Sequence, residues 1–148
     1  MSRSRGATIA FNAPTPQPTD PMIFSQSSQT PIPAPGNSLA FTGANADAVA
    51  SPGTLAAGTA TLINRAGTLS TLVVKGDTNA VTTAEVFTVE KNGADTAIVA
   101  TAAVGQSVAE DLTHSVAVVK GDYISLRHNA NATPTFTAIA FALYFTPS

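Results

Sequence analysis

The sequence predicts an all-β protein: a jelly-roll-like β-sandwich of about eight antiparallel strands, preceded by an extended, proline-rich N-terminal arm. Composition is the first observation behind this prediction. Hydrophobic residues make up 44% of the 148 residues and only 11% are charged, whereas helical bundles are rich in Glu and Lys. The second is a series of short apolar stretches with period-two alternation, separated by turn residues. The third is a sharp change of character near Gly36, before which prolines dominate.

The predicted arm covers residues 1–38. Seven of the ten prolines lie between Pro14 and Pro35. Proline fixes φ and lacks an amide donor, so we expect extended or irregular backbone here, with no helix and no central strand. A disordered tail and a docking arm both fit this composition. In a docking arm, scattered apolar residues would contact a neighbouring subunit or a shell: Ile9, Phe11, Met22, Ile23, Phe24 and Ile32.

The predicted β domain covers residues 39–148, as a sandwich or jelly roll. Its expected strands are a short one at Leu39–Thr42, two in residues 60–64 and 69–74, a hairpin in 84–104, a strand–turn–strand unit in 113–129, and a final strand at Thr135–Phe145. The hairpin is the clearest of these, because Asn92–Gly93 tolerates the positive φ angles of a tight turn.

The final strand is apolar on both faces. Thr137, Ile139 and Phe141 alternate with Ala138 and Ala140. Such a strand either packs its second face against another subunit or lies under a loop. We favour an oligomer, and expect a trimer interface formed by five residues: Phe136, Ile139, Phe141, Leu143 and Phe145.

The pentapeptide "VVKGD" occurs twice, at Val73–Asp77 and Val118–Asp122. It could mark an internal repeat, a Lys-Gly-Asp adhesion tripeptide or two strand exits. The residues that follow the two copies differ, which argues against a repeat, and such tripeptides arise often by chance. We interpret both copies as strand ends, with Gly76 and Gly121 supplying an unusual φ.

Composition and motifs exclude several classes of function. The net charge is −2 without a basic cluster in the β domain, so we expect no nucleic-acid partner. There is no cysteine, no signal-peptide pattern and no stretch of membrane-spanning length, so we expect a soluble protein with no membrane partner.

Catalytic and metal-binding patterns are equally weak. His114 and His128 lack metal-ligand spacing, and we expect both to be solvated. Glu110 and Asp111 are adjacent and read as a solvated turn. A pair drawn from Glu85, Glu90 and Asp95 could still meet in space for glycoside cleavage, although no motif favours it.

Calcium binding by Asp77, Asp95 or Asp122 would need more oxygen ligands than any one loop supplies. We therefore expect no enzyme activity, no metal and no cofactor.

The C-terminal part resembles a known group. "FTVEKNGADTAIVATAAV" and "SVAVVKGDYISLRHNANATPTFTAIAFALYF" are similar to the trimeric jelly-roll heads of the tumour-necrosis-factor and C1q type, in bacterial and phage versions such as the heads of collagen-like exosporium glycoproteins. The resemblance covers residues 54–148. It rests on the Asn92–Gly93 turn, on Gly121–Asp122 with the strand Ile124–Leu126, and on Phe136–Phe145, which it implies is a strand near a trimer axis. The chain departs from the group in having no collagen-like stalk.

These observations favour a structural virion protein: a capsid decoration, or cement, protein of a phage or virus. It would trimerise on the shell and clamp the major capsid protein with its arm. We expect it on the outer capsid surface, after synthesis in the host cytoplasm. The alternative is a trimeric receptor- or glycan-binding head of a fibre or surface filament.

Overall fold

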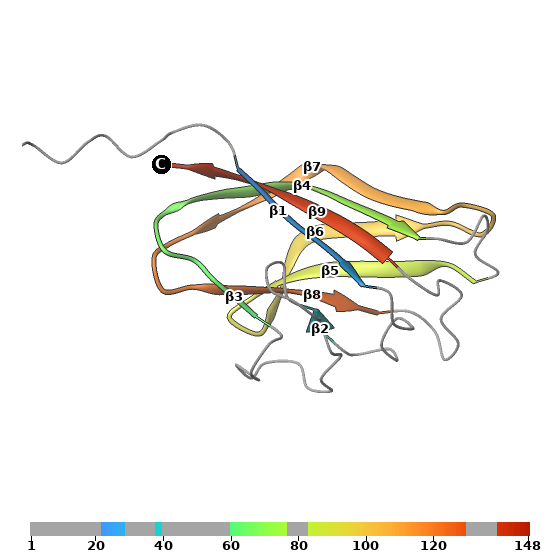
Figure 1. Ribbon diagram of the computed structural model, residues 1–148, viewed down its shortest axis with the longest axis horizontal. Helices are drawn as coiled ribbons and strands as arrows, with labels where there is room; N and C mark the ends of the chain where they lie inside the picture. The colour runs from blue at the N-terminus through green and yellow to red at the C-terminus, as the bar shows by residue number, and fades with distance from the viewer. Residues whose placement is uncertain (1–21, 29–37, 40–59, 77–82, 130–138) are drawn as a thin grey trace, which may run out of the picture.

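The structure, a computed structural model, describes residues 22–28, 38–39, 60–76, 83–129 and 139–148. These residues form nine β-strands in two layers (Figure 1). The strands are β1 (Met22–Ser28), β2 (Ser38–Leu39), β3 (Thr61–Leu62), β4 (Gly67–Gly76), β5 (Glu85–Lys91), β6 (Ala94–Ala102), β7 (Val108–Val118), β8 (Tyr123–His128) and β9 (Ile139–Pro147). The described part of the chain contains no helix long and apolar enough to cross a membrane.

The two sheets have the strand order of a jelly roll. Sheet A has the order β1-β9-β4-β7, and sheet B has the order β2-β8-β5-β6, with β3 also paired to β8. Every pair is antiparallel. The chain thus alternates between the layers as two interlocked Greek keys do. The predicted fold class is confirmed.

The core lies between the sheets, because each strand points alternate side chains inward. β9 shows this most clearly: Ile139, Phe141, Leu143 and Phe145 are at most 3% exposed. They meet inward side chains of both sheets, among them Leu69, Leu72, Val74, Phe87, Val89, Ile98, Ile124 and Leu126.

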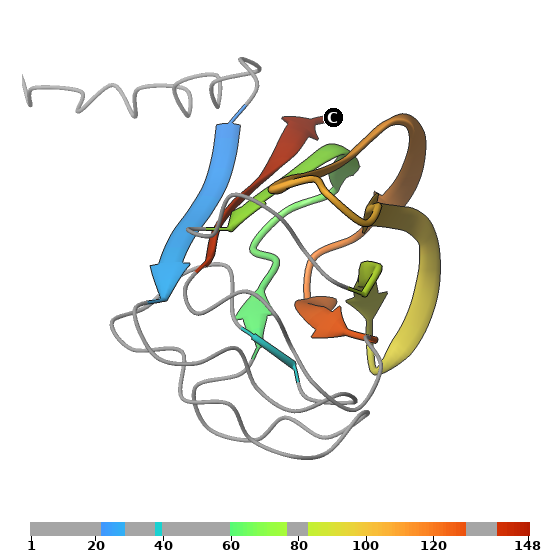
Figure 2. The ribbon, with the colours of Figure 1, turned by 90° about the vertical axis from the view of Figure 1, so that its right-hand side faces the viewer.

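Along one side the edge strands of the two sheets, β6 and β7, lie side by side (Figure 2). We call this contact the β6–β7 seam. It closes one edge of each sheet against the other, which limits the free strand edge that could pair with another chain.

The first strand lies inside the segment predicted to be an arm. β1 pairs with β9 over seven residues, from Met22 opposite Phe145 to Ser28 opposite Ile139. The sandwich therefore includes Met22–Ser28, which lie within the segment 1–38 that the sequence assigns to the arm. The physical reason is that Pro21 and Pro31 flank a proline-free run, and a strand at the edge of a sheet tolerates such neighbours.

Two predicted turns are present and contact each other. Asn92 and Gly93 have φ of 53° and 78°, as a two-residue turn between β5 and β6 requires. Gly121 has φ of 97° in the turn between β7 and β8. Asn92 donates to the Asp122 carboxylate over 2.7 Å and accepts from the Tyr123 amide over 3.0 Å.

The two "VVKGD" copies differ in structure. The copy at Val118–Asp122 forms the strand exit expected of it. In the first copy, β4 continues to Gly76, which pairs with Ile139 and is not among the positive-φ glycines. The expected turn at Gly76 was wrong, and Asp77 lies outside the described residues.

Sheet A has an irregularity at its centre. Thr71 of β4 has φ of 54°, an uncommon value for a β-branched residue, and the register of β4 shifts there against both neighbours. On the β7 side, Ser70 is opposite Ser115 and Leu72 is opposite Asp111. Three residues of β7, 112–114, therefore lie opposite the single residue Thr71. This excursion of β7 shapes the polar site described next.

Candidate functional sites

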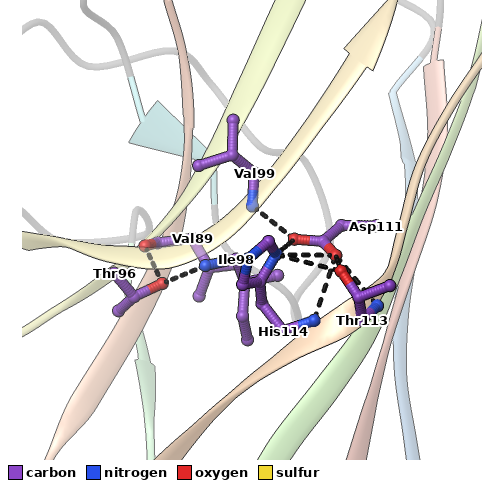
Figure 3. A network of polar contacts seen from close by, with 7 residues as sticks. All are labelled: Val89, Thr96, Ile98, Val99, Asp111, Thr113 and His114. Carbon is purple, nitrogen blue, oxygen red and sulfur yellow. Dashed lines mark hydrogen bonds and ion pairs between the residues drawn. The ribbon is translucent and has the colours of Figure 1, made fainter.

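A polar site with several hydrogen bonds lies on the β6–β7 seam and centres on Asp111 (Figure 3). Its carboxylate accepts hydrogen bonds from the backbone amides of Val99 (2.9 Å), Thr113 (3.0 Å) and His114 (3.1 Å). The Thr113 hydroxyl and the His114 ring also contact it, at 3.1 and 2.9 Å. Because Val99 belongs to β6, this side chain joins sheet B to sheet A.

The surroundings of Asp111 keep it ionised. Burial opposes ionisation, but the amides of Val99, Thr113 and His114 and the His114 ring outweigh it and hold the pKa of Asp111 well below its usual range. An ionised carboxylate only accepts, so His114 Nδ1 donates to it. The interpretation of Glu110–Asp111 as a solvated turn was wrong for Asp111, which is 6% exposed within a strand.

The Asp111–His114 pair resembles part of a catalytic triad but lacks its geometry. The nearby hydroxyl of Thr113 lies 3.2 Å from Nδ1, the nitrogen that already faces the carboxylate. A nucleophile activated by this imidazole would have to lie at Nε2. The arrangement therefore fits a structural role, which stabilises the excursion of β7.

The two histidines have opposite environments. The side chain of His114 is 57% exposed, as expected for a solvated histidine. His128 is fully buried, stacks on Phe87 with ring centroids 5.0 Å apart, and contacts the Glu85 carboxylate at 2.5 Å. The expectation that His128 is solvated was wrong, because the inward face of β8 carries it together with Leu126 into the core.

A second polar network lies on the outward face of sheet B. Arg127 of β8 contacts Asp95 of β6 and lies 3.7 Å from Glu90 of β5. The hydroxyl of Ser125 donates to Glu90 over 2.7 Å. Two of the acids considered for glycoside cleavage do meet, but a guanidinium lies between them. The third, Glu85, is on the opposite face of β5 with the core residues.

Of the acids considered as calcium ligands, the two that the structure describes belong to different networks. Asp95 belongs to the Arg127 network. Asp122 accepts from the Val119 amide and from Asn92 and forms an ion pair of 3.2 Å with Lys91, and these contacts lower its pKa against the opposing effect of burial. Within the described ranges, no group of three acidic, histidine or cysteine side chains is placed to hold a metal ion.

The predicted trimer interface lies on the inward face of β9. Ile139, Phe141, Leu143 and Phe145 are core residues of this chain, so their side chains do not face outward. Phe136 lies outside the described residues. A subunit contact through β9 would have to use its second face. Alternate residues form that face: Ala140, Ala142, Tyr144 and Thr146.

The outward face of sheet A is broad and mostly uncharged. Cross-strand register aligns Thr146, Thr68 and Ala117 in one row and Tyr144, Ser70 and Ser115 in the next. In the following row Ala142 and Val73 lie beside Glu110, and Lys75 lies beyond. We call the eight uncharged residues of these rows the outer face of sheet A: Thr68, Ser70, Val73, Ser115, Ala117, Ala142, Tyr144 and Thr146.

A shallow polar depression of about 390 Å³ lies at the β6–β7 turn. Its lining residues come from the ends of both strands and from the turn between them: Thr101, Gly105, Gln106, Ser107, Val108 and Glu110. Hydroxyl, amide and carboxylate groups gather here. Such groups suit a polar, uncharged ligand.

The remaining predicted residues concern the arm. Met22, Ile23 and Phe24 are in β1, where their backbone pairs with β9. Ile9, Phe11 and Ile32 lie outside the described residues. In sequence comparisons, no protein family model and no curated protein matches the chain.

Proposed function

We propose that this chain is a structural virion protein: a capsid decoration protein that forms a homotrimer on the outer surface of a phage or viral shell. The observation that carries the proposal is the outer face of sheet A. Its first two rows across β9, β4 and β7 are uncharged, Glu110 is the charged neighbour in the third row, and the face exposes 40% of Tyr144. Jelly rolls are a frequent architecture of virus-shell proteins.

An uncharged face suits association between identical chains. Side chains close to a threefold axis approach their own copies, so charged residues there would repel one another. Small residues such as Ala142 and Ser70 allow close approach, and an exposed tyrosine is a frequent interface residue. Two further copies of this chain are therefore the occupants that this face fits.

The N-terminal residues supply the contact with the shell in this proposal. Residues 1–21 precede β1, and their apolar residues Ile9 and Phe11 would bind grooves of the major capsid protein. Many weak contacts repeated three times per trimer give strong attachment. The proposal assigns no catalytic step and no cofactor, and it has the protein made in the host cytoplasm before it joins the virion.

The trimer is tested by a matched pair of charge insertions. Ala142→Glu places a carboxylate on the outer face of sheet A, and Ala97→Glu places one on exposed β6. Sedimentation equilibrium should give trimers for the wild type and for Ala97→Glu, and monomers for Ala142→Glu. A monomeric wild type at micromolar concentration, or a trimeric Ala142→Glu, would refute the interface.

Shell attachment is tested by deleting residues 1–20. The deletion stops before Met22 because removing β1 would also remove the edge of sheet A. We expect the shortened chain to bind shells that lack the protein at least about tenfold more weakly than the full chain, since multivalent contacts are lost. Equal affinity would contradict the role of the arm.

A second candidate function is a trimeric receptor- or glycan-binding head. The polar depression at the β6–β7 turn favours it, because hydroxyl, amide and carboxylate groups bind sugar hydroxyls. Glycan-array binding that disappears in Glu110→Gln and persists in Glu85→Gln would support this candidate. Shell binding without glycan binding would support the decoration protein.

A further inference from the structure

We propose that Asn92 is a deamidation site, protected while two turns are in contact and reactive once they separate. The turns are Asn92–Gly93, between β5 and β6, and Val119–Asp122, between β7 and β8, and we call them the turn pair. Asn92 is the one asparagine of the sequence that a glycine follows. The reaction needs no second chain and is therefore independent of the proposed trimer.

The reacting groups belong to neighbouring residues, so water is the one co-reactant. The backbone nitrogen of Gly93 attacks Cγ of the Asn92 side chain and forms a C–N bond. The side-chain nitrogen takes up the proton of the Gly93 amide and leaves as ammonia, and a cyclic imide remains. Water then opens the ring at either carbonyl carbon, which leaves aspartate or isoaspartate at this position. Glycine favours the attack because no Cβ crowds its nitrogen.

The closed turn pair holds Asn92 against this attack. The side chain donates to the Asp122 carboxylate over 2.7 Å and accepts from the Tyr123 amide over 3.0 Å, and the Asn92 amide donates to the Tyr123 carbonyl over 2.9 Å. To form the ring, the carboxamide must turn toward Gly93, which breaks both side-chain hydrogen bonds. One of them goes to a charged group, and losing it alone slows the reaction at least about tenfold.

The contacts that close the turn pair are polar and lie near solvent. Asn92 itself is exposed, and the second link is the ion pair of 3.2 Å between Lys91 and Asp122, in which the lysine side chain is 30% exposed. Water can replace such contacts while the apolar core between the sheets stays intact. The turn pair therefore opens locally, at a lower free energy than the unfolding of the whole sandwich.

The product does not fit the closed turn pair. Asp122 is ionised, because the Val119 amide and Lys91 lower its pKa. An aspartate at position 92 has no donor for this carboxylate and repels it. An isoaspartate routes the main chain through its Cβ, and the extra atom disturbs the pairing of Lys91 with Ala94 next to the turn. Deamidation thus leaves a lasting record that the turns have been open.

Peptide mapping by mass spectrometry measures the reaction in the full chain, incubated in mildly alkaline buffer. Four samples are compared: the native wild type, the wild type in urea, Asp122→Ala and Asp111→Ala. Asp122→Ala removes the acceptor of the Asn92 side chain. Asp111→Ala is the matched control, because it weakens the β6–β7 seam and leaves the contacts of Asn92 in place.

We expect deamidation of Asn92 in urea and in Asp122→Ala to be at least about tenfold faster than in the native wild type, and in Asp111→Ala to stay within about twofold of it. Equal rates in the native and the unfolded wild type, or in Asp122→Ala and the wild type, would overturn the protection. A rate in Asp111→Ala as high as in Asp122→Ala would overturn local opening, since the reaction would then follow global unfolding.

Hydrogen exchange of the Tyr123 amide tests the same mechanism in the wild type alone, should Asp122→Ala fail to fold. Urea concentrations below the unfolding transition should raise this exchange and the deamidation rate together, and a deamidation rate that does not follow the exchange refutes the mechanism. After removal of urea, the deamidated chain should keep fast exchange at Tyr123. Exchange as slow as in the unmodified chain would show that the modified turns close again, against the proposal.

Discussion

Replacing Asp111 by alanine removes the side chain that joins sheet A to sheet B at the β6–β7 seam. Three backbone amides lose their acceptor: Val99, Thr113 and His114. The amide of Val99 lies between two strands, and leaving it without an acceptor costs about 2 kcal/mol. The amides of Thr113 and His114 belong to exposed residues and can bind water, so we assign them about 0.5 kcal/mol each.

The expected loss of unfolding free energy for Asp111→Ala is therefore about 3 kcal/mol. The ion pair with His114 adds little, since that ring is 57% exposed, and His114→Ala should cost less than about 1 kcal/mol. Asp111→Asn keeps one acceptor oxygen but turns an amide group toward backbone donors. It should cost about 2 kcal/mol.

Urea unfolding measures these differences. With a slope of about 1.5–2 kcal/mol per molar, a loss of about 3 kcal/mol lowers the midpoint by roughly 1.5–2 M. Glu110→Ala is the matched control, because it removes an exposed carboxylate from the neighbouring position and should change stability by less than about 0.5 kcal/mol. Amide hydrogen exchange of Val99 reports on the seam itself and should quicken in Asp111→Ala. A midpoint equal to that of Glu110→Ala, or unchanged exchange at Val99, would refute the reasoning.

Three further predictions concern the same fold. Because the pKa of Asp111 is lower in the folded than in the unfolded state, the stabilisation that its carboxylate provides is full above about pH 5 and is lost as the pH falls. The melting temperature of the wild type should therefore decline in acid more steeply than that of Asp111→Asn. Parallel curves of melting temperature against pH would contradict this. Asn92→Asp places a second carboxylate against Asp122, where the hydrogen bond is now 2.7 Å long, and should lower the free energy of unfolding by about 2 kcal/mol. Adding Asp122→Asn should recover part of this loss. A double variant less stable than Asn92→Asp in thermal unfolding would contradict the pairing. Gly121→Ala should lower the free energy of unfolding by about 1–2 kcal/mol, because alanine is strained at a positive φ. Gly67→Ala should lower it by more, because the added Cβ would lie 2.5 Å from a backbone oxygen of β9. Equal urea midpoints for the two variants would count against this steric argument.

Local chemistry made the hairpins predictable. Asn92–Gly93 needs no distant contact to favour a tight turn, and the alternation around Phe87 and Val89 marks the strand before it. The apolar strand β9 was equally clear. Which of its faces would be inside was not, because Ile139 and Ala140 are both apolar and only the packing of the other sheet distinguishes them.

The buried polar side chains and strand β1 could not be predicted without knowing which distant segments they contact. The period-two pattern Ile124, Leu126, His128 does place the histidine on an apolar face, and that pattern was available in the sequence. Its acidic partner, Glu85, comes from a distant segment. β1 was missed because prolines flank it and because the described strand that it pairs with, β9, comes more than 100 residues later in the sequence.

The central position of β9 in sheet A constrains the order in which the protein can fold during synthesis. Met22 pairs with Phe145, so the first of the described strands to leave the ribosome must wait for the last of them. Until β9 is made, β4 and β7 can pair with each other, but β1 has no partner among the other described strands and sheet A cannot close. The two ends of the described sheet therefore come together only when the synthesis of β9 is complete.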